Sequence, residues 1–242
     1  MEKLKKELQE KGYTFFKMQD YPEFVDDYNN NKKYVCNSEK NLLDSINGVR
    51  LDGHGFQNNI GSSNTTKIVL SQEYKSFKIA EKIVNTEYLP FIDTVNSFSQ
   101  YWFYGSAQSD EPDSIMYSFK NLITKIVATI YDEDVTKLKH HISLTYYKPG
   151  CFLEQHRDGK TGTRICAVLI YLNDEDYKTE WGGNIVFEGT ETVEPIYGNI
   201  AILDFKEGNC LHEVKKVVDG YGRYAILDFV SLGDSVVTPN YY

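Results

Sequence analysis

The sequence predicts an α+β fold in which helices pack on one face of a β-barrel or β-sandwich. Helical patterns dominate the first half of the 242 residues, and short β-like segments follow one another from about residue 140. The composition, 41% hydrophobic and 25% charged, is typical of a globular protein, and 19 Tyr and 13 Phe favour β-structure. We therefore expect one domain, 1–242, with helical support and a candidate lid in 1–135 and the β-rich core in 136–235.

The first half contains one predicted helix near its start and a long region of loop character. Residues 2–11 favour a helix that ends at Gly12, and the next segment, YTFFKM, has strand character. Residues 28–66 are rich in Asn, Gly and Ser, so we expect loops there, and these are the candidate lid. A second helix is predicted at about 72–86, and Pro90 is a candidate start of another.

The clearest helical pattern follows the sequence DEPD. Its apolar residues recur at intervals of three and four, which is the spacing of one helix face. They are Ile115, Phe119, Leu122, Ile123, Ile126, Val127 and Ile130. An apolar face of this kind indicates a helix that packs against the core.

The second half reads as a series of short strands separated by turns that contain Gly, Asp or Pro. The predicted strands are 140–147, 164–172, 184–189, 199–205 and 223–230. Trp181, Gly182 and Gly183 are expected to form a tight turn that leads into the third of these. No internal repeat or low-complexity segment divides the chain.

Charge and cysteine content exclude several classes of protein. The net charge of −9 argues against a surface that binds nucleic acid, because phosphates require a basic face. The four cysteines form no C-x-x-C pair and are too few for a disulfide framework. The first residues lack a secretion signal, and no apolar run reaches the roughly 18 residues of a membrane span. We expect a cytoplasmic protein without membrane or nucleic-acid partners.

Three residues are candidate metal ligands. His156 and Asp158 are two positions apart at a predicted strand end, so their side chains can leave the same face, and His212 follows the strand 199–205. Two imidazoles and one carboxylate suit a non-haem Fe(II) oxygenase site, whereas structural zinc is usually closed by four ligands. The alternatives are a hydrogen bond at a loop mouth for the first two residues and a core histidine for the third.

Arg223 is the candidate anion-binding residue. It opens a very apolar predicted strand, and the preceding segment VVDGYG can bring it back beside the metal candidates. A buried guanidinium requires an anion, and its planar fork fits a carboxylate with two parallel hydrogen bonds. The alternative is a surface arginine paired with Asp228 or Glu213.

The stretch from Tyr147 to Val230 resembles the catalytic core of the 2-oxoglutarate- and Fe(II)-dependent dioxygenases, most closely the prolyl 4-hydroxylase branch. Five segments carry the resemblance and occur in the family's order. They are YKPGCFLEQHRD (147–158), LIYLN (169–173), WGGNIVF (181–187), VEPIYGNIAILDF (193–205) and HEVKKVVDGYGRYAILDFV (212–230). The residues before about 130 show no such match.

The resemblance implies a double-stranded β-helix, a jelly-roll or cupin-like fold, with N-terminal helices packed on one sheet. It also implies that His156, Asp158 and His212 are the catalytic iron ligands and that Arg223 binds the distal carboxylate of 2-oxoglutarate. Tyr147 resembles the tyrosine that hydrogen-bonds this co-substrate, and Tyr171 is a second candidate. The implied cofactors and co-substrates are Fe(II), 2-oxoglutarate and O₂, with ascorbate as an accessory reductant.

The reaction implied by the resemblance is hydroxylation of an unactivated C–H bond, with release of succinate and CO₂. The expected substrate is a prolyl or other residue in a peptide or protein. The alternatives are a free amino acid or small natural product, or a non-catalytic cupin-like binding module. Nucleic-acid dealkylation is disfavoured, because Phe229 stands where that branch usually has a second arginine.

The remaining histidines and cysteines have simpler interpretations. His140 and His141 are adjacent, so in a strand they point to opposite faces, and we expect packing or exposure rather than metal binding. His54 lies in a glycine-rich segment and is expected to be a solvated loop residue. Cys210 is expected to fill space in the core.

Overall fold

The computed structural model describes residues 1–36, 56–62, 69–70, 97–104, 115–147, 149–158, 163–205, 210–220 and 222–233. The helices predicted at 72–86 and from Pro90, and His54, lie outside the described residues. Within them, no helix is both long and apolar enough to cross a membrane.

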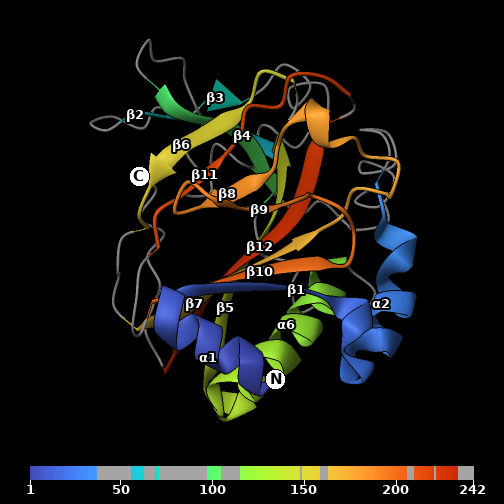
Figure 1. Cartoon of the computed structure of the whole chain (residues 1–242), viewed down its shortest axis with the longest axis vertical. Coiled ribbons are helices and arrows are strands. Elements are labelled where there is room, and N and C mark those ends of the chain that lie inside the picture. Colours follow the sequence, from blue (N-terminus) through green and yellow to red (C-terminus); the bar gives the residue numbers. More distant parts are fainter. Residues whose placement is uncertain are drawn as a thin grey trace.

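Antiparallel strands form one continuous, strongly curved path. Its order is β1 (Tyr13–Lys17), β10 (Asn199–Asp204), β7 (Arg164–Tyr171), β12 (Arg223–Leu232), β5 (Leu138–Tyr147), β4 (Ser97–Tyr104), β6 (Phe152–His156), β11 (His212–Val214), β8 (Ile185–Phe187) and β9 (Glu191–Val193). The path folds over, so that β6, β8 and β11 lie across from β1, β7 and β10 (Figure 1). This arrangement confirms the predicted α+β fold with a double-stranded β-helix core.

The space between the two halves of the path is an apolar interior. Side chains from β7, such as Leu169 and Tyr171, meet Ile185 and Phe187 of β8 there. The alternate residues of β7 belong to a second apolar cluster on the outer face, and all eight residues of the strand are buried. A strand covered on both faces reads as a continuous apolar run, which explains the sequence RICAVLIY.

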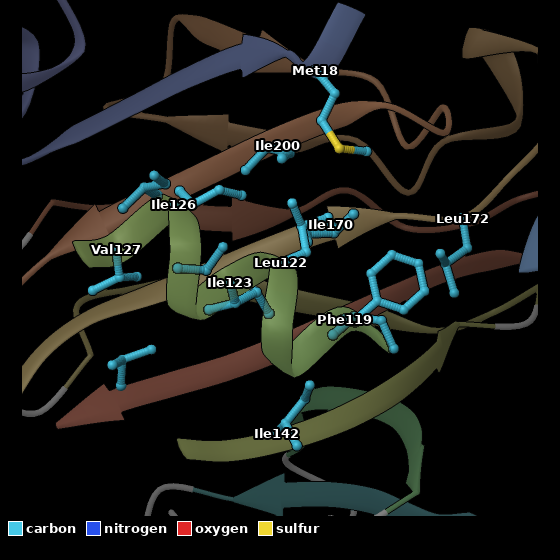
Figure 2. Close-up of a cluster of buried hydrophobic side chains, with 14 of the residues drawn as sticks. Met18, Phe119, Leu122, Ile123, Ile126, Val127, Ile142, Ile170, Leu172 and Ile200 are labelled. Atoms are coloured by element: carbon cyan, nitrogen blue, oxygen red, sulfur yellow. The ribbon is translucent and has the colours of Figure 1, made fainter. Parts of the chain in front are cut away.

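In the described part of the chain, the helices α6 (Ile115–Tyr131) and α1 (Glu2–Lys11) cover the outer face. The helix α6 buries its predicted apolar stripe there, and Figure 2 shows Phe119, Leu122 and Ile126 packed over Ile170 and Ile200. The helix α1 lies beside α6 and ends at Gly12, whose φ of 76° allows the left-handed cap. The predicted positions of both helices, and their packing on one sheet, are confirmed.

The prediction of loops across 28–66 is wrong at both described ends of that range. Its start belongs to α2 (Val25–Asn31) and the 3₁₀ turn at Lys32–Tyr34. Near its end, β2 (Phe56–Ser62) pairs with β4 and with the short β3 (Val69–Leu70). The Asn-rich β2 has little intrinsic strand preference, so its ladder with β4 is a tertiary effect that local sequence does not encode. The 1–135 part therefore contributes strands as well as helices.

Four further 3₁₀ turns connect these elements. They are Met18–Asp20, Pro22–Phe24, Val135–Lys137 and Thr179–Trp181. The last of them leads through Gly182 and Gly183, with φ of 81° and 76°, into β8. The predicted turn before this strand is therefore present.

Candidate active site

Two of the candidate ligands face each other across neighbouring strands. His156 is the last residue of β6, and His212, the first residue of β11, is its antiparallel partner in the ladder. Residues directly opposite in such a ladder share one face of the sheet. The two imidazole rings accordingly have their centroids 4.3 Å apart.

Asp158 completes the cluster from the segment that follows β6. Its Oδ1 lies 3.4 Å from Nε2 of His156, and its Oδ2 lies 3.7 Å from Nε2 of His212. One ligand atom from each of the three residues lies within 4.8 Å of the others. The structure thus brings together all three predicted residues, with the two Nε2 atoms and the carboxylate directed at a common centre.

The other nitrogen of each ring is engaged by the backbone. Nδ1 of His156 lies 2.8 Å from the carbonyl oxygen of Glu154, and Nδ1 of His212 lies 3.1 Å from that of Cys210. A carbonyl can only accept, so each Nδ1 carries the proton and each Nε2 presents a lone pair. This is the tautomer that a metal bound at Nε2 requires.

Burial and mutual charge set the protonation of the cluster. Burial lowers the pKa of His212, with the charge of Asp158 opposing it. Burial also lowers the pKa of His156, but the hydrogen bond and charge of Asp158 outweigh it, and the net shift is upward. For Asp158, burial raises the pKa, and the interactions with both histidines reverse this to a net lowering. The carboxylate is therefore held ionised, as a metal ligand must be.

Arg223 lies in the interior, with 1% of its surface exposed. It is the first residue of β12 and pairs with Tyr147 of β5. Its guanidinium carbon lies 4.6 Å from the ring centre of Tyr147 and 5.1 Å from that of Tyr171. Both rings stabilise the cation by cation–π contact.

The alternative pairing of Arg223 with Asp228 or Glu213 is wrong. Asp228 instead accepts a hydrogen bond from Nδ1 of His140 at 2.5 Å, and Glu213 pairs with Lys215 at 2.7 Å. Both acidic residues are thus engaged elsewhere.

Three polar atoms around Arg223 lack a hydrogen-bond partner among the described residues. They are Nε and Nη2 of Arg223 and the hydroxyl of Tyr171, all fully buried. Nε and Nη2 form one edge of the guanidinium and can donate two parallel hydrogen bonds to a carboxylate. Buried donors are normally satisfied, so these atoms fit an anionic ligand such as the distal carboxylate of 2-oxoglutarate.

Tyr177, which the sequence did not identify as functional, lies close to Arg223. Tyr177 is buried, donates its hydroxyl to the carbonyl of Gly182 at 3.0 Å and packs edge-on against Trp181. A Cβ at Gly183 would lie 3.0 Å from Cβ of Arg223 and 3.1 Å from the hydroxyl of Tyr177. The pair of glycines in the sequence is the signal for this contact, because Gly183 leaves room for the arginine in addition to its part in the turn.

The other described histidines and cysteines are not members of the group of metal candidates. His140 is buried, and its Nε2 lies 3.0 Å from the hydroxyl of Thr124 on α6, so it faces the helix and not the interior. Among the described residues, the only group with metal-ligand geometry is His156, Asp158 and His212. Cys210 is buried in the interior cluster, as expected for core filling.

Comparison with known proteins agrees with this geometry. The family model of the 2OG-Fe(II) oxygenase superfamily matches residues 142–231. A prolyl-4-hydroxylase from Pseudomonas putida shares the fold with a TM-score of 0.56 and 13% identity over 95% of this chain and 97% of its own. A Trichoplax adhaerens prolyl hydroxylase, solved with a peptide of hypoxia inducible factor, has a TM-score of 0.53 and 14% identity over 94% of this chain and 87% of its own. No curated protein matches the sequence.

Residues 142–231 span β5 to β12 and contain every candidate ligand and Arg223. The chain therefore matches the 2OG-Fe(II) oxygenase superfamily over its catalytic strands, and it shares its fold with prolyl hydroxylases. It is a 2-oxoglutarate-dependent non-haem iron dioxygenase, whose class uses Fe(II), 2-oxoglutarate and O₂. The predicted family, enzyme class and cofactors are confirmed.

Proposed function

We propose that this enzyme hydroxylates an unactivated C–H bond of a prolyl or other amino-acid residue in a peptide or protein. The observation that carries the proposal is the pairing of two features in one interior. The ligand atoms of His156, Asp158 and His212 lie within 4.8 Å of one another. Beside two tyrosine rings, Arg223 presents two buried donors that have no hydrogen-bond partner among the described residues. An iron centre and a dicarboxylate site are the two elements that this oxidation requires.

The residues have separate roles in this proposal. His156, Asp158 and His212 would hold Fe(II) through two imidazoles and one carboxylate, a ligand set that suits non-haem Fe(II) oxygenases. Arg223 binds the distal carboxylate of 2-oxoglutarate through Nε and Nη2, and the Tyr171 hydroxyl donates to the same group. The oxidising power comes from Fe(II), 2-oxoglutarate and O₂ when they are bound, and succinate and CO₂ are released. The protein positions the reactants and excludes water from them.

A peptide substrate is favoured by the structural likenesses. Of the two similar structures described above, one is named a prolyl-4-hydroxylase, and the other is a prolyl hydroxylase solved with a peptide. Each likeness extends over more than nine tenths of this chain, so it includes the part outside the catalytic strands.

The test measures succinate and oxygen incorporation together. The full chain is incubated with Fe(II) and 2-oxoglutarate, first alone, then with proline-containing peptides, and then with free amino acids. We expect peptides to stimulate succinate formation and to gain one oxygen atom by mass spectrometry. Stimulation by free amino acids but not by peptides would contradict the proposed substrate class.

Two variants test the assigned residues. His156→Ala should abolish iron-dependent succinate formation, and Arg223→Ala should mainly raise the concentration of 2-oxoglutarate required, because it removes a binding contact. Glu191→Gln on β9 is the control. The Glu191 carboxylate accepts a hydrogen bond from Lys11 at 2.7 Å and is not part of the candidate metal group. Full activity of His156→Ala would exclude the proposed metal centre.

A further inference from the structure

Glu188 contacts the segment before the distal histidine in two ways. It is the first of the three residues that connect β8 and β9, and the hydrogen bond from Thr190 N–H to Phe187 O, 3.0 Å, closes a β-turn that has Glu188 and Gly189 at its centre. The backbone N–H of Glu188 donates to the carbonyl oxygen of Leu211 at 2.8 Å. Its side-chain Oε1 accepts from the N–H of Leu211, also at 2.8 Å. Both backbone groups of the residue next to His212 are thus bound by Glu188.

The amide bound by the Glu188 carboxylate is the amide that orients His212. The peptide unit between Cys210 and Leu211 presents its N–H to Oε1 of Glu188, and its carbonyl oxygen accepts from Nδ1 of His212 at 3.1 Å. Hydrogen bonds in series polarise one another, so the carboxylate makes this carbonyl a stronger acceptor. A carboxylate bonded directly to a ligand histidine fixes the ring and raises its basicity. In this protein the Cys210–Leu211 amide lies between the Glu188 carboxylate and the His212 ring, and it transmits the same polarisation to the ring.

A second contact joins Glu188 to the other ligands. Nη1 of Arg157 lies 3.6 Å from the same Oε1, and Arg157 stands between His156 and Asp158 in the sequence. Both side chains are substantially exposed, so the ion pair contributes little to the free energy of unfolding. The position of this ion pair matters more than its strength. It places the Glu188 carboxylate between the segment that contains Arg157 and the segment that contains Leu211, and these two segments bear the candidate ligands.

The backbone conformation argues that the glutamate side chain is needed at this position. Glu188 has φ of 49° and Gly189 has φ of 74°, so both residues are left-handed. β-turns with two left-handed central residues favour Asn and Gly, and a glutamate gains nothing from the conformation itself. The contacts with Leu211 and Arg157 are what the side chain adds.

We infer that Glu188 is a positioning residue for the metal centre, holding and polarising the Cys210–Leu211 amide that directs Nε2 of His212 at the ion. The inference rests on the metal role proposed above for the two histidines and Asp158. It concerns metal binding and is independent of the substrate.

The test uses Co(II) as a spectroscopic probe on the full chain, without substrate. Glu188→Ala should bind Co(II) about tenfold more weakly and shift its visible absorption bands, because the ring of His212 loses its fixed orientation. Glu188→Gln keeps an acceptor for Leu211 N–H but not the charge, so it should recover most of the spectrum with an intermediate affinity. Glu191→Gln, on the other strand of the same hairpin, should match the unsubstituted protein in both readouts.

Three results would overturn the inference. One is a Co(II) affinity of Glu188→Ala within about twofold of the unsubstituted protein with unchanged bands, since altered ligation must weaken or shift them. Another is an equal loss in Glu191→Gln. The third is a lowered unfolding temperature of metal-free Glu188→Ala with Co(II) binding retained. If His156→Ala leaves Co(II) binding intact, the metal site itself is wrong, and that failure is distinct from all three.

Discussion

Arg223 and Tyr171 come from different strands and meet in the interior, with the guanidinium carbon 5.1 Å from the ring centre. Together they hold three buried polar atoms without a hydrogen-bond partner among the described residues. Leaving such donors unsatisfied is costly, and the cost is greater for a charged group. The pair is therefore arranged for an anionic occupant rather than for the stability of the free protein.

Tyr171→Phe should weaken 2-oxoglutarate binding by about tenfold, because it removes a hydrogen bond to a charged group. The ring remains, so its contact with Arg223 is preserved. The Michaelis constant for 2-oxoglutarate, measured by succinate formation, is expected to rise while the rate at saturation changes little.

Tyr147→Phe is the comparison that separates the two tyrosines named by the sequence. The Tyr147 ring lies 4.6 Å from the guanidinium carbon, and phenylalanine retains that cation–π contact. We expect a smaller effect than at Tyr171. A larger rise in the Michaelis constant for Tyr147→Phe would reverse the assignment.

Metal binding should stabilise the protein through Asp158. With Co(II) at about 100 times its dissociation constant, the free energy of unfolding should rise by about 2.7 kcal/mol. Asp158→Ala removes the carboxylate that faces both Nε2 atoms, so most of this increment should disappear. Thermal unfolding with Co(II) and with a chelator measures it. An undiminished increment in Asp158→Ala would place the metal elsewhere.

The core strands and the ligand cluster could be predicted from the sequence because each depends on local pattern. The continuous apolar run of β7 reflects burial on both faces, and the spacing of His156 and Asp158 places both side chains at one strand end. The family's motif order then linked these residues to His212 and Arg223. Local sequence pattern was sufficient to predict the individual strands and the ligand pair, and the order of the motifs indicated that these segments form one site.

The features that were missed depend on contacts between distant segments. The strand β2 reads as polar loop and is defined by its ladder with β4. The hydrogen bond from Leu211 N–H to Glu188 joins residues 23 positions apart through the register of β8 against β11. Register of this kind is set by the whole sheet, so neither residue carries a recognisable local signal.

Gly182→Ala should destabilise the protein by about 3 kcal/mol or more, because the new Cβ would lie 2.0 Å from the carbonyl oxygen of Lys216. Gly150→Ala is the matched control, since Gly150 also has positive φ, 98°, but no atom within 4 Å of the added Cβ. That control should lose only about 1 to 2 kcal/mol from backbone strain. Urea unfolding compares the two. Equal losses would show that the close approach to Lys216 is not what requires glycine.

The buried pair of His140 and Asp228 should contribute to stability and not to co-substrate binding. His140→Leu leaves the Asp228 carboxylate buried alone and should cost about 3 kcal/mol. Replacing both residues with leucine should cost less than the single change, because no unpaired charge remains. Affinity for 2-oxoglutarate should be unchanged in both variants, since His140 bonds to Thr124 of α6 on the outer face. A weakened affinity would contradict that placement.

His141 should make the protein less stable as the pH falls below about 6.5, the ordinary histidine value. Burial lowers its pKa, with the charge of Asp228 opposing and that of Arg164 adding to the effect. The unfolded chain then binds a proton more readily than the folded protein, so the contribution of neutral His141 to stability is complete above the unfolded pKa and is lost as the pH falls through it.

Burial lowers the pKa of His212 as well, so the measurement must isolate the effect of His141. His141→Gln stays neutral, and the free energy of unfolding of this variant should depend less steeply on pH between about 5 and 7 than that of the unsubstituted protein. Identical slopes for the two proteins would show that His141 is as readily protonated in the folded state as in the unfolded chain.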